Sequence, residues 1–141
     1  MREEKHNEAL AEVNTYIDES LKFDLLRRQR LLMMALSLGM QHLVELWLHK
    51  SGAIKHGAQV KHEFFKSGEK KLRLKLSGML SKDIKSLKNS SRILSIARDI
   101  ELDRDDIIYG SPLKNDAVLR EKIDKFFELK KSIKESVGDI L

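Results

Sequence analysis

The segment from Leu31 to Leu48 constrains the fold of this chain most, because it is apolar on nearly every side at helical spacing. A helix that is hydrophobic all round has to be buried among other elements. Asp24 is suited to cap its start, and Gly52 is suited to end it just after Lys50. We therefore predict a long central helix from about Asp24 to Lys50, lying in the core.

The remaining sequence also favours helices. One proline and seven glycines in 141 residues leave few breaks, and strand-like alternation is rare. The run Lys71–Leu76 does alternate, but an edge strand there would have no evident partner, so we predict helix or irregular structure. The fold class predicted is all-α, an up-and-down bundle of four to five helices, with residues 1–141 forming one domain. The other predicted helices cover Glu3–Ser20, Ala58–Lys66, Ser81–Tyr109 and the chain from Asp116 onward.

The first and last helices each have one apolar face, which is predicted to pack inward. In the first helix this face consists of Leu10, Val13, Ile17 and Leu21. In the last helix it consists of Val118, Ile123, Phe126, Phe127, Ile133 and Val137.

Composition excludes several classes of protein. Without cysteine there is no disulfide framework, thiolate metal site or cysteine nucleophile. The charged start Met1–His6 does not fit a signal peptide, and no apolar run is expected to span a membrane. We predict a cytoplasmic protein without a membrane partner. No phosphate-binding glycine loop, dinucleotide fingerprint or serine-hydrolase elbow is present.

Basic charge is concentrated in one segment. Twelve Lys or Arg residues and three carboxylates lie between Lys50 and Arg92, a local net charge of +9 in a chain whose total is +5. Such a segment is suited to RNA phosphates or an acidic partner, although most lysine-rich runs are simply solvated surface. The candidate phosphate or RNA contacts are Lys61, Lys70, Lys71, Arg73 and Lys75.

Arg104 stands where the helical pattern calls for an apolar residue. Ile93, Ala97, Ile100 and Ile107 share one face at three- and four-residue steps, and Arg104 interrupts that row. Because a guanidinium stays charged, on a buried face it needs an acidic partner, an anion or a wet cleft. Arg104 is therefore a candidate site residue.

The central helix has one polar stripe, formed by Gln41, His42, Glu45 and His49. This stripe is suited to line a groove or subunit interface, and Glu45 is a candidate partner for Arg104. His42, Glu45 and His49 also have the spacing of metal ligands on one helix face, but single-helix ligand patterns are weak signals, and we predict no metal and no cofactor.

Other titratable groups give weaker signals. His56 and His62 lie in or beside a predicted short helix, and loop histidines are usually structural or solvated. Asp99, Asp103 and Asp106 are spaced to share one helix face, where carboxylates could hold magnesium, but a solvated acidic face is the commoner explanation.

The sequence Arg104-Asp105-Asp106-Ile107-Ile108-Tyr109-Gly110 precedes the last amphipathic helix. Together with the long central helix and the helix order, it resembles the HEPN family of small all-α proteins over roughly Leu25 to Ser136. The resemblance implies a four- to five-helix bundle, usually a homodimer. Many family members are metal-independent ribonucleases built on an arginine, a polar residue and a histidine.

In terms of this resemblance, Arg104 and Asp105 fit the first two positions, and Tyr109 stands where the histidine belongs. The implied catalytic residues are therefore Arg104, Asp105 and Tyr109, with Gln41, His42 and Glu45 supporting the cleft. Imidazole titrates near neutrality, whereas a tyrosine has an ordinary pKa of about 10 and is a poor base at pH 7. Tyr109 can still donate a hydrogen bond.

Three functions compete. The favoured one is a non-catalytic HEPN-like homodimer that binds a nucleotide, RNA or a protein partner in its cleft. The second is a metal-independent ribonuclease, the toxin of a toxin–antitoxin pair, using Arg104 and Tyr109. A helical metal protein using His42, Glu45 and His49 is a distant third. The resemblance also implies a small nucleotidyltransferase as a partner.

Overall fold

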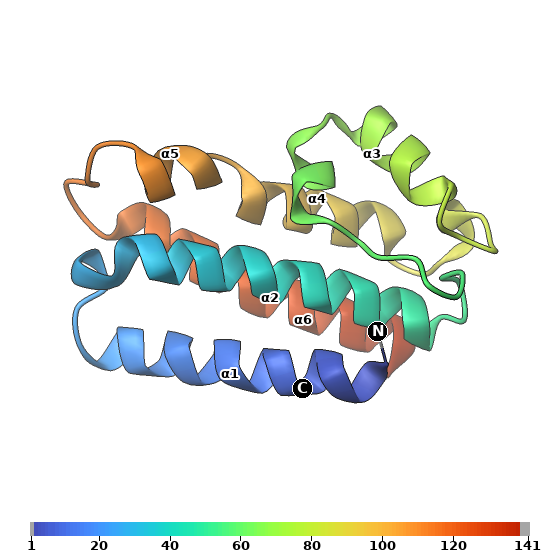
Figure 1. Ribbon diagram of the computed structural model, residues 1–141, viewed down its shortest axis with the longest axis horizontal. Coiled ribbons are helices and arrows are strands. Elements are labelled where there is room, and N and C mark those ends of the chain that lie inside the picture. Colours follow the sequence, from blue (N-terminus) through green and yellow to red (C-terminus); the bar gives the residue numbers. More distant parts are fainter. Residues whose placement is uncertain (1, 139–141) are drawn as a thin grey trace.

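The computed structural model of the chain describes residues 2–138, and this part is helical (Figure 1). The prediction of an all-α fold is confirmed. Within these residues no β-strand is formed, and only one antiparallel bridge joins Ile54 and Leu80. The α-helices are α1 (Glu3–Lys22), α2 (Gln29–Lys50), α3 (Glu69–Ser77), α4 (Ser90–Glu101), α5 (Arg104–Tyr109) and α6 (Ala117–Val137). Short 3-10 turns are η1 (Leu26–Arg28), η2 (His62–Lys66) and η3 (Ile84–Ser86).

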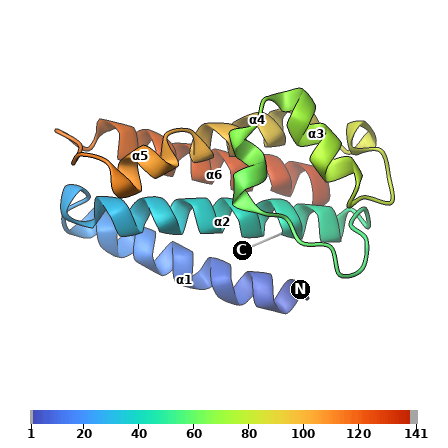
Figure 2. The ribbon, with the colours of Figure 1, turned by 45° about the horizontal axis from the view of Figure 1, so that its top comes forward.

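Helix α2 is the centre of the bundle. It packs against α1, α4, α5 and α6, as its apolar circumference predicts. Figure 1 shows α1 below it, α4 and α5 above it and α6 behind it, with the chain reversing direction from one layer to the next. This is the predicted up-and-down arrangement. The small helix α3 lies outside α4, away from α2 (Figure 2).

The buried apolar residues of the described chain form one core around α2. Trp47 is the largest fully buried side chain, and its indole N–H donates to Ser136 Oγ on α6 at 3.1 Å. This hydrogen bond satisfies the polar end of the indole inside the core. Gly39 lies where α1 and α6 pack against α2, and a Cβ added there would meet Phe126 and Val13.

Two predicted helices at the start of the chain are confirmed with adjusted ends. Helix α1 extends two residues beyond the predicted Ser20. Helix α2 proper begins at Gln29, because the chain first makes the turn η1. Asp24 caps that turn, since its Oδ1 accepts the backbone N–H of Leu26 at 3.0 Å.

The predicted helix from Ser81 to Tyr109 is wrong. Ser81 bonds through its hydroxyl to the carbonyl of Ala53 at 3.1 Å, and α4 begins only at Ser90. A second break follows at Asp103, whose φ of 62° separates α4 from α5. The buried ammonium group of Lys122 donates to the carbonyls of Asp99, Ile100 and Leu102 at 2.8, 3.0 and 2.6 Å, which satisfies the end of α4 and makes this break favourable.

Two further expectations are corrected, and one is confirmed. The helix predicted over Ala58–Lys66 is only the 3-10 turn η2. The alternating run Lys71–Leu76, predicted to be helix or irregular structure, is part of helix α3. Leu21, Val118 and Phe127 are partly exposed rather than inward, while Leu119 and Leu129 pack in the core in α6.

The segment Leu26–Lys50 is long and apolar enough to cross a membrane by length and composition, contrary to the sequence-based expectation. However, 72% of its most apolar 18-residue window is buried inside the bundle. Such burial is typical of the core helix of a soluble protein, so the fold is compatible with one. The cytoplasmic location stays a prediction.

Candidate functional site

Arg104 is the first residue of α5, directly after the break at Asp103. Its side chain is 14% exposed. The Nε–H donates to Ser37 Oγ at 3.1 Å, and Nη1 donates to Asp105 Oδ1 at 2.8 Å. Nε also lies 3.5 Å from Glu101 Oε1. The arginine that interrupts the apolar row is therefore largely buried and held by carboxylates.

Glu101 is the residue on which this site converges. Its carboxylate is buried and accepts the Ser37 hydroxyl at 2.9 Å and His62 Nδ1 at 2.8 Å. Burial raises the pKa of Glu101, and its hydrogen bonds with His62 and Ser37 counteract only part of that effect. We call Ser37, His62, Glu101 and Arg104 the Glu101 cluster. It joins α2, η2, α4 and α5 at one carboxylate.

His62 is the member of the Glu101 cluster with a proton-transfer side chain. When Glu101 is ionised, its carboxylate only accepts hydrogen bonds, and Nδ1 of His62 is then the donor in this contact. The ring is partly exposed, and in its neutral form Nε2 is then an acceptor. A carboxylate that orients an imidazole in this way is the arrangement used by general bases.

A hollow on one side of Arg104 has a mixed charge. Three of its residues are cationic, namely Lys66, Arg98 and Arg104, and five are acidic, namely Asp99, Glu101, Asp103, Asp105 and Asp106. Asp105 pairs with Lys66 at 2.6 Å and with Arg104 at 2.8 Å, and these contacts, the Lys66 hydrogen bond foremost, lower the pKa of Asp105. Because carboxylates outnumber cations, the hollow does not favour a polyphosphate.

A second hollow on the other side of Arg104 is apolar. It is lined by Met34, Ala35, Ser37, Leu38, Gln41, His62 and Arg104. It continues an exposed stripe on α2 in which Leu31 is 61%, Met34 43% and Leu38 45% exposed. We call Leu31, Met34 and Leu38 the α2 stripe. Large apolar side chains exposed in a row are typical of an interaction surface.

Tyr109 does not join Arg104 within one chain. It is 75% exposed at the end of α5, and neither hollow that Arg104 lines includes it among the described residues. Asp105, the third residue of the proposed set, does contact Arg104. Arg104 and Tyr109 could therefore share one HEPN-like site only if the two residues came from different chains.

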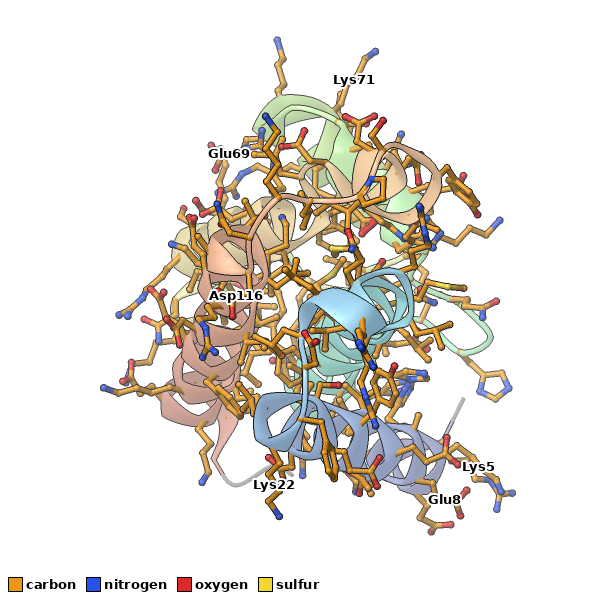
Figure 3. All side chains as sticks on the ribbon, turned by 90° about the vertical axis from the view of Figure 1, so that its left-hand side faces the viewer. Lys5, Glu8, Lys22, Glu69, Lys71 and Asp116 are labelled. Atoms are coloured by element: carbon orange, nitrogen blue, oxygen red, sulfur yellow. The ribbon has the colours of Figure 1, made fainter. Side chains whose placement is uncertain are left out.

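The five candidate phosphate contacts do not line either hollow beside Arg104 in the described part of the chain. Lys70, Lys71, Arg73 and Lys75 belong to α3, and Lys61 is exposed before η2. Figure 3 shows Lys71 pointing outward from α3, far from the central layers. Arg73 pairs with Glu69 at 2.9 Å, and Lys75 donates to Ser67 Oγ at 3.0 Å. None of the five lines a hollow with Arg104 in the described chain.

The polar stripe of α2 divides between two sites. Gln41 lines the apolar hollow with Arg104. His42 and Glu45 instead face α1, where His42 Nδ1 lies 2.9 Å from His6 Nδ1 and Glu45 Oε1 lies 3.3 Å from His6 Nε2. The expectation that Glu45 pairs with Arg104 is wrong, because Glu101 takes that place.

Comparison of the chain with protein-family models, with curated proteins and with solved structures finds no match. The HEPN resemblance therefore stays a proposal that rests on the residues quoted for it.

Sequence reasoning missed three residues that contact these candidate sites. His62 lies 39 positions before Glu101 in the 3-10 turn η2, and His6 lies 36 positions before His42 in another helix. In the sequence, Glu101 is one of several acidic residues close to Arg104. Only the tertiary fold brings His62 and His6 to their partners, so no spacing pattern could have found them. Glu101 lies three positions before Arg104, a spacing at which helical side chains can pair.

Proposed function

We propose that the chain is a non-catalytic, HEPN-like helical module that forms a homodimer and binds a protein partner. The surface used is the one formed by the α2 stripe and the apolar hollow beside Arg104. The observation that carries this proposal is the α2 stripe, three exposed apolar side chains in a row beside Arg104. Covering such a row removes apolar surface from water, which favours association. In this proposal a second copy of this chain covers the α2 stripe, which agrees with the homodimers that the resemblance implies.

A protein fits this face better than RNA does. The apolar hollow offers contact area for side chains, whereas the adjacent charged hollow holds more carboxylates than cations. The basic residues of α3 that would attract RNA lie outside the bundle and away from the cluster. In this proposal the companion nucleotidyltransferase is the partner class, and RNA or nucleotide binding is the weaker alternative.

Light scattering and sedimentation on the purified chain test the dimer. We expect a homodimer at micromolar concentration, and Leu38→Glu should convert it to a folded monomer, because a charge within the α2 stripe opposes burial. Leu74→Glu is the control, because Leu74 is also a leucine and is 66% exposed, against 45% for Leu38, but lies on α3. A wild type that stays monomeric at high micromolar concentration contradicts the proposal.

The second candidate function is a metal-independent ribonuclease, acting as a toxin, in which His62 replaces Tyr109 as the proton-transfer group. The contact of His62 with Glu101 at 2.8 Å, in the same hollow as Arg104, favours it specifically. The assay is cleavage of total RNA in the presence of chelator. Cleavage lost in His62→Ala and Arg104→Ala but kept in Tyr109→Phe would establish this function, and no cleavage by the wild type would exclude it.

A further inference from the structure

Three side chains on α1 and α2 point unpaired polar atoms at one another inside the protein. The atoms are His6 Nε2, Glu45 Oε1 and His49 Nε2, and all three are buried without a hydrogen-bond partner in residues 2–138. They lie within 4.8 Å of one another. Buried polar atoms are nearly always satisfied, so three converging exceptions call for a ligand that can bind them all.

We infer that His6, Glu45 and His49 bind one zinc ion. Two imidazoles and a carboxylate are a ligand set that zinc uses where its fourth position stays open to water. Bonds of about 2.0–2.1 Å in a tetrahedral site place neighbouring ligand atoms roughly 3.3–3.4 Å apart. Glu45 Oε1 lies 3.3 Å from His6 Nε2 and 3.8 Å from His49 Nε2, close to that spacing without an ion.

The groups behind these ligands are arranged as a metal site needs. The other carboxylate oxygen of Glu45 accepts the backbone N–H of Val60 at 3.2 Å, which fixes the carboxylate and leaves Oε1 free. When His6 Nε2 binds the ion, its proton is on Nδ1 and donates to His42 Nδ1 at 2.9 Å. Such outer hydrogen bonds fix the tautomer and orientation of a metal-binding histidine. His42 is therefore a positioning residue and not a ligand.

The charges of the residues also suit a cation. Glu45 is the acidic group among the three ligands, and its side chain is almost fully buried. A buried carboxylate that faces imidazole nitrogens gains much from a bound cation, which offsets its charge.

Zinc has a route to this position. His49 is 24% exposed and lines an open hollow together with Arg2, Glu3, Ile54, Lys55, His56 and Gly57, whereas His6 and Glu45 are almost fully buried. The ion and a fourth, solvent ligand would reach the site from the His49 side. Because the ligands come from α1 and α2, binding would also fasten the first turns of α1 to the end of α2.

The test is calorimetric titration of tag-free, chelator-washed protein with Zn²⁺, together with thermal melts. We expect one Zn²⁺ per chain and a rise in Tm on binding. His49→Ala should weaken binding by more than about 100-fold, because even an outer-shell partner contributes roughly 10–100-fold, and His42→Ala should show that smaller loss. His56→Ala is the matched control, since it removes an imidazole from the same hollow and should bind normally.

Because His6 is buried, His6→Ala also removes core packing, so the role of His6 in binding is measured in the wild-type protein. In ¹⁵N spectra of the imidazoles, the ring resonances of His6 and His49 should move on zinc addition while those of His56 do not. A wild type that binds no Zn²⁺ overturns the inference. Binding that survives in His49→Ala, or that is lost in His56→Ala, also overturns it.

Discussion

Glu101 and Arg104 show what a sequence can and cannot predict for single residues. The sequence identifies Arg104 as a candidate because it interrupts an apolar row, and in the structure its guanidinium does contact the carboxylates of Glu101 and Asp105. Its partner was predicted to be Glu45 and is Glu101, because the αL residue Asp103 changes the direction of the chain between them. Asp tolerates that conformation better than most residues, but nothing in the sequence requires it there.

Replacing Arg104 measures how far the Glu101 cluster supports the fold. We expect Arg104→Ala to lower the free energy of unfolding by about 1.5–3 kcal/mol, the usual value of hydrogen bonds to charged groups. The loss stays moderate because Glu101 keeps Ser37 and His62 as partners. Urea denaturation measures it, with Arg92→Ala, an exposed arginine on α4, as the control. A loss within experimental error would mark Arg104 as a solvated arginine.

The raised pKa of Glu101 predicts a pH dependence of stability. The folded state keeps this proton to a higher pH than the unfolded chain, in which Glu titrates near about 4.3. The stabilisation is therefore complete below that unfolded pKa and is lost as pH rises toward the folded pKa. Glu101→Gln removes the titration, so its free energy of unfolding should fall less over this range than that of the wild type.

Urea denaturation between pH 4 and neutrality, a range chosen from the ordinary pKa of about 4.3, checks this prediction. The groups facing Glu101 are Ser37 on α2, His62 on η2 and Arg104 on α5, and the variant changes none of these residues. Asp106→Asn, an exposed carboxylate on α5, serves as control and should leave the pH profile unchanged. Identical profiles for Glu101→Gln and the wild type would contradict the prediction.

Helices were predictable where one pattern dominates. The apolar circumference of α2 and the single apolar face of α1 gave their positions within a few residues. Between Ser81 and Tyr109 the pattern was equally helical, yet the chain breaks twice there. The second break depends on Lys122, twenty positions farther along, whose ammonium group binds the end of α4. A contact of that kind cannot be seen in local periodicity.

Gly39 tests the packing of α2 as an element. In an open helix, Gly→Ala gains about 1 kcal/mol from helix propensity. At Gly39 an added Cβ would lie 2.6 Å from Phe126 Cε2 and 2.9 Å from Val13 Cγ1, so α1 or α6 must shift. Overpacking costs about 1–3 kcal/mol, so we expect Gly39→Ala to be destabilising on balance in thermal melts.

Gly68→Ala is the matched control for Gly39, because no atom lies within 4 Å of its added Cβ and its φ of −59° suits alanine. It should leave Tm nearly unchanged. A stabilising Gly39→Ala would mean that α2 is not packed as tightly against α1 and α6 as the structure has it.

At the scale of the whole molecule, stability depends on α2. It contacts every layer of the bundle, whereas α3 contacts the rest mainly through the 3-10 turns η2 and η3. Regions with few buried contacts open at lower cost than the core. The molecule therefore combines a cooperative bundle with a peripheral basic segment.

Native-state hydrogen exchange should resolve this difference. We expect the slowest amides in the buried part of α2, including those of Leu43 and Leu46, to exchange only through global unfolding. The amides of α3, held through Leu72 and Leu76 alone among its buried residues, should exchange through a local opening of lower free energy. Denaturant should then accelerate exchange in α2 strongly and in α3 weakly, because local opening exposes little surface. Equal sensitivity to denaturant in both helices would show that α3 unfolds with the bundle and that the basic segment is a full part of the core.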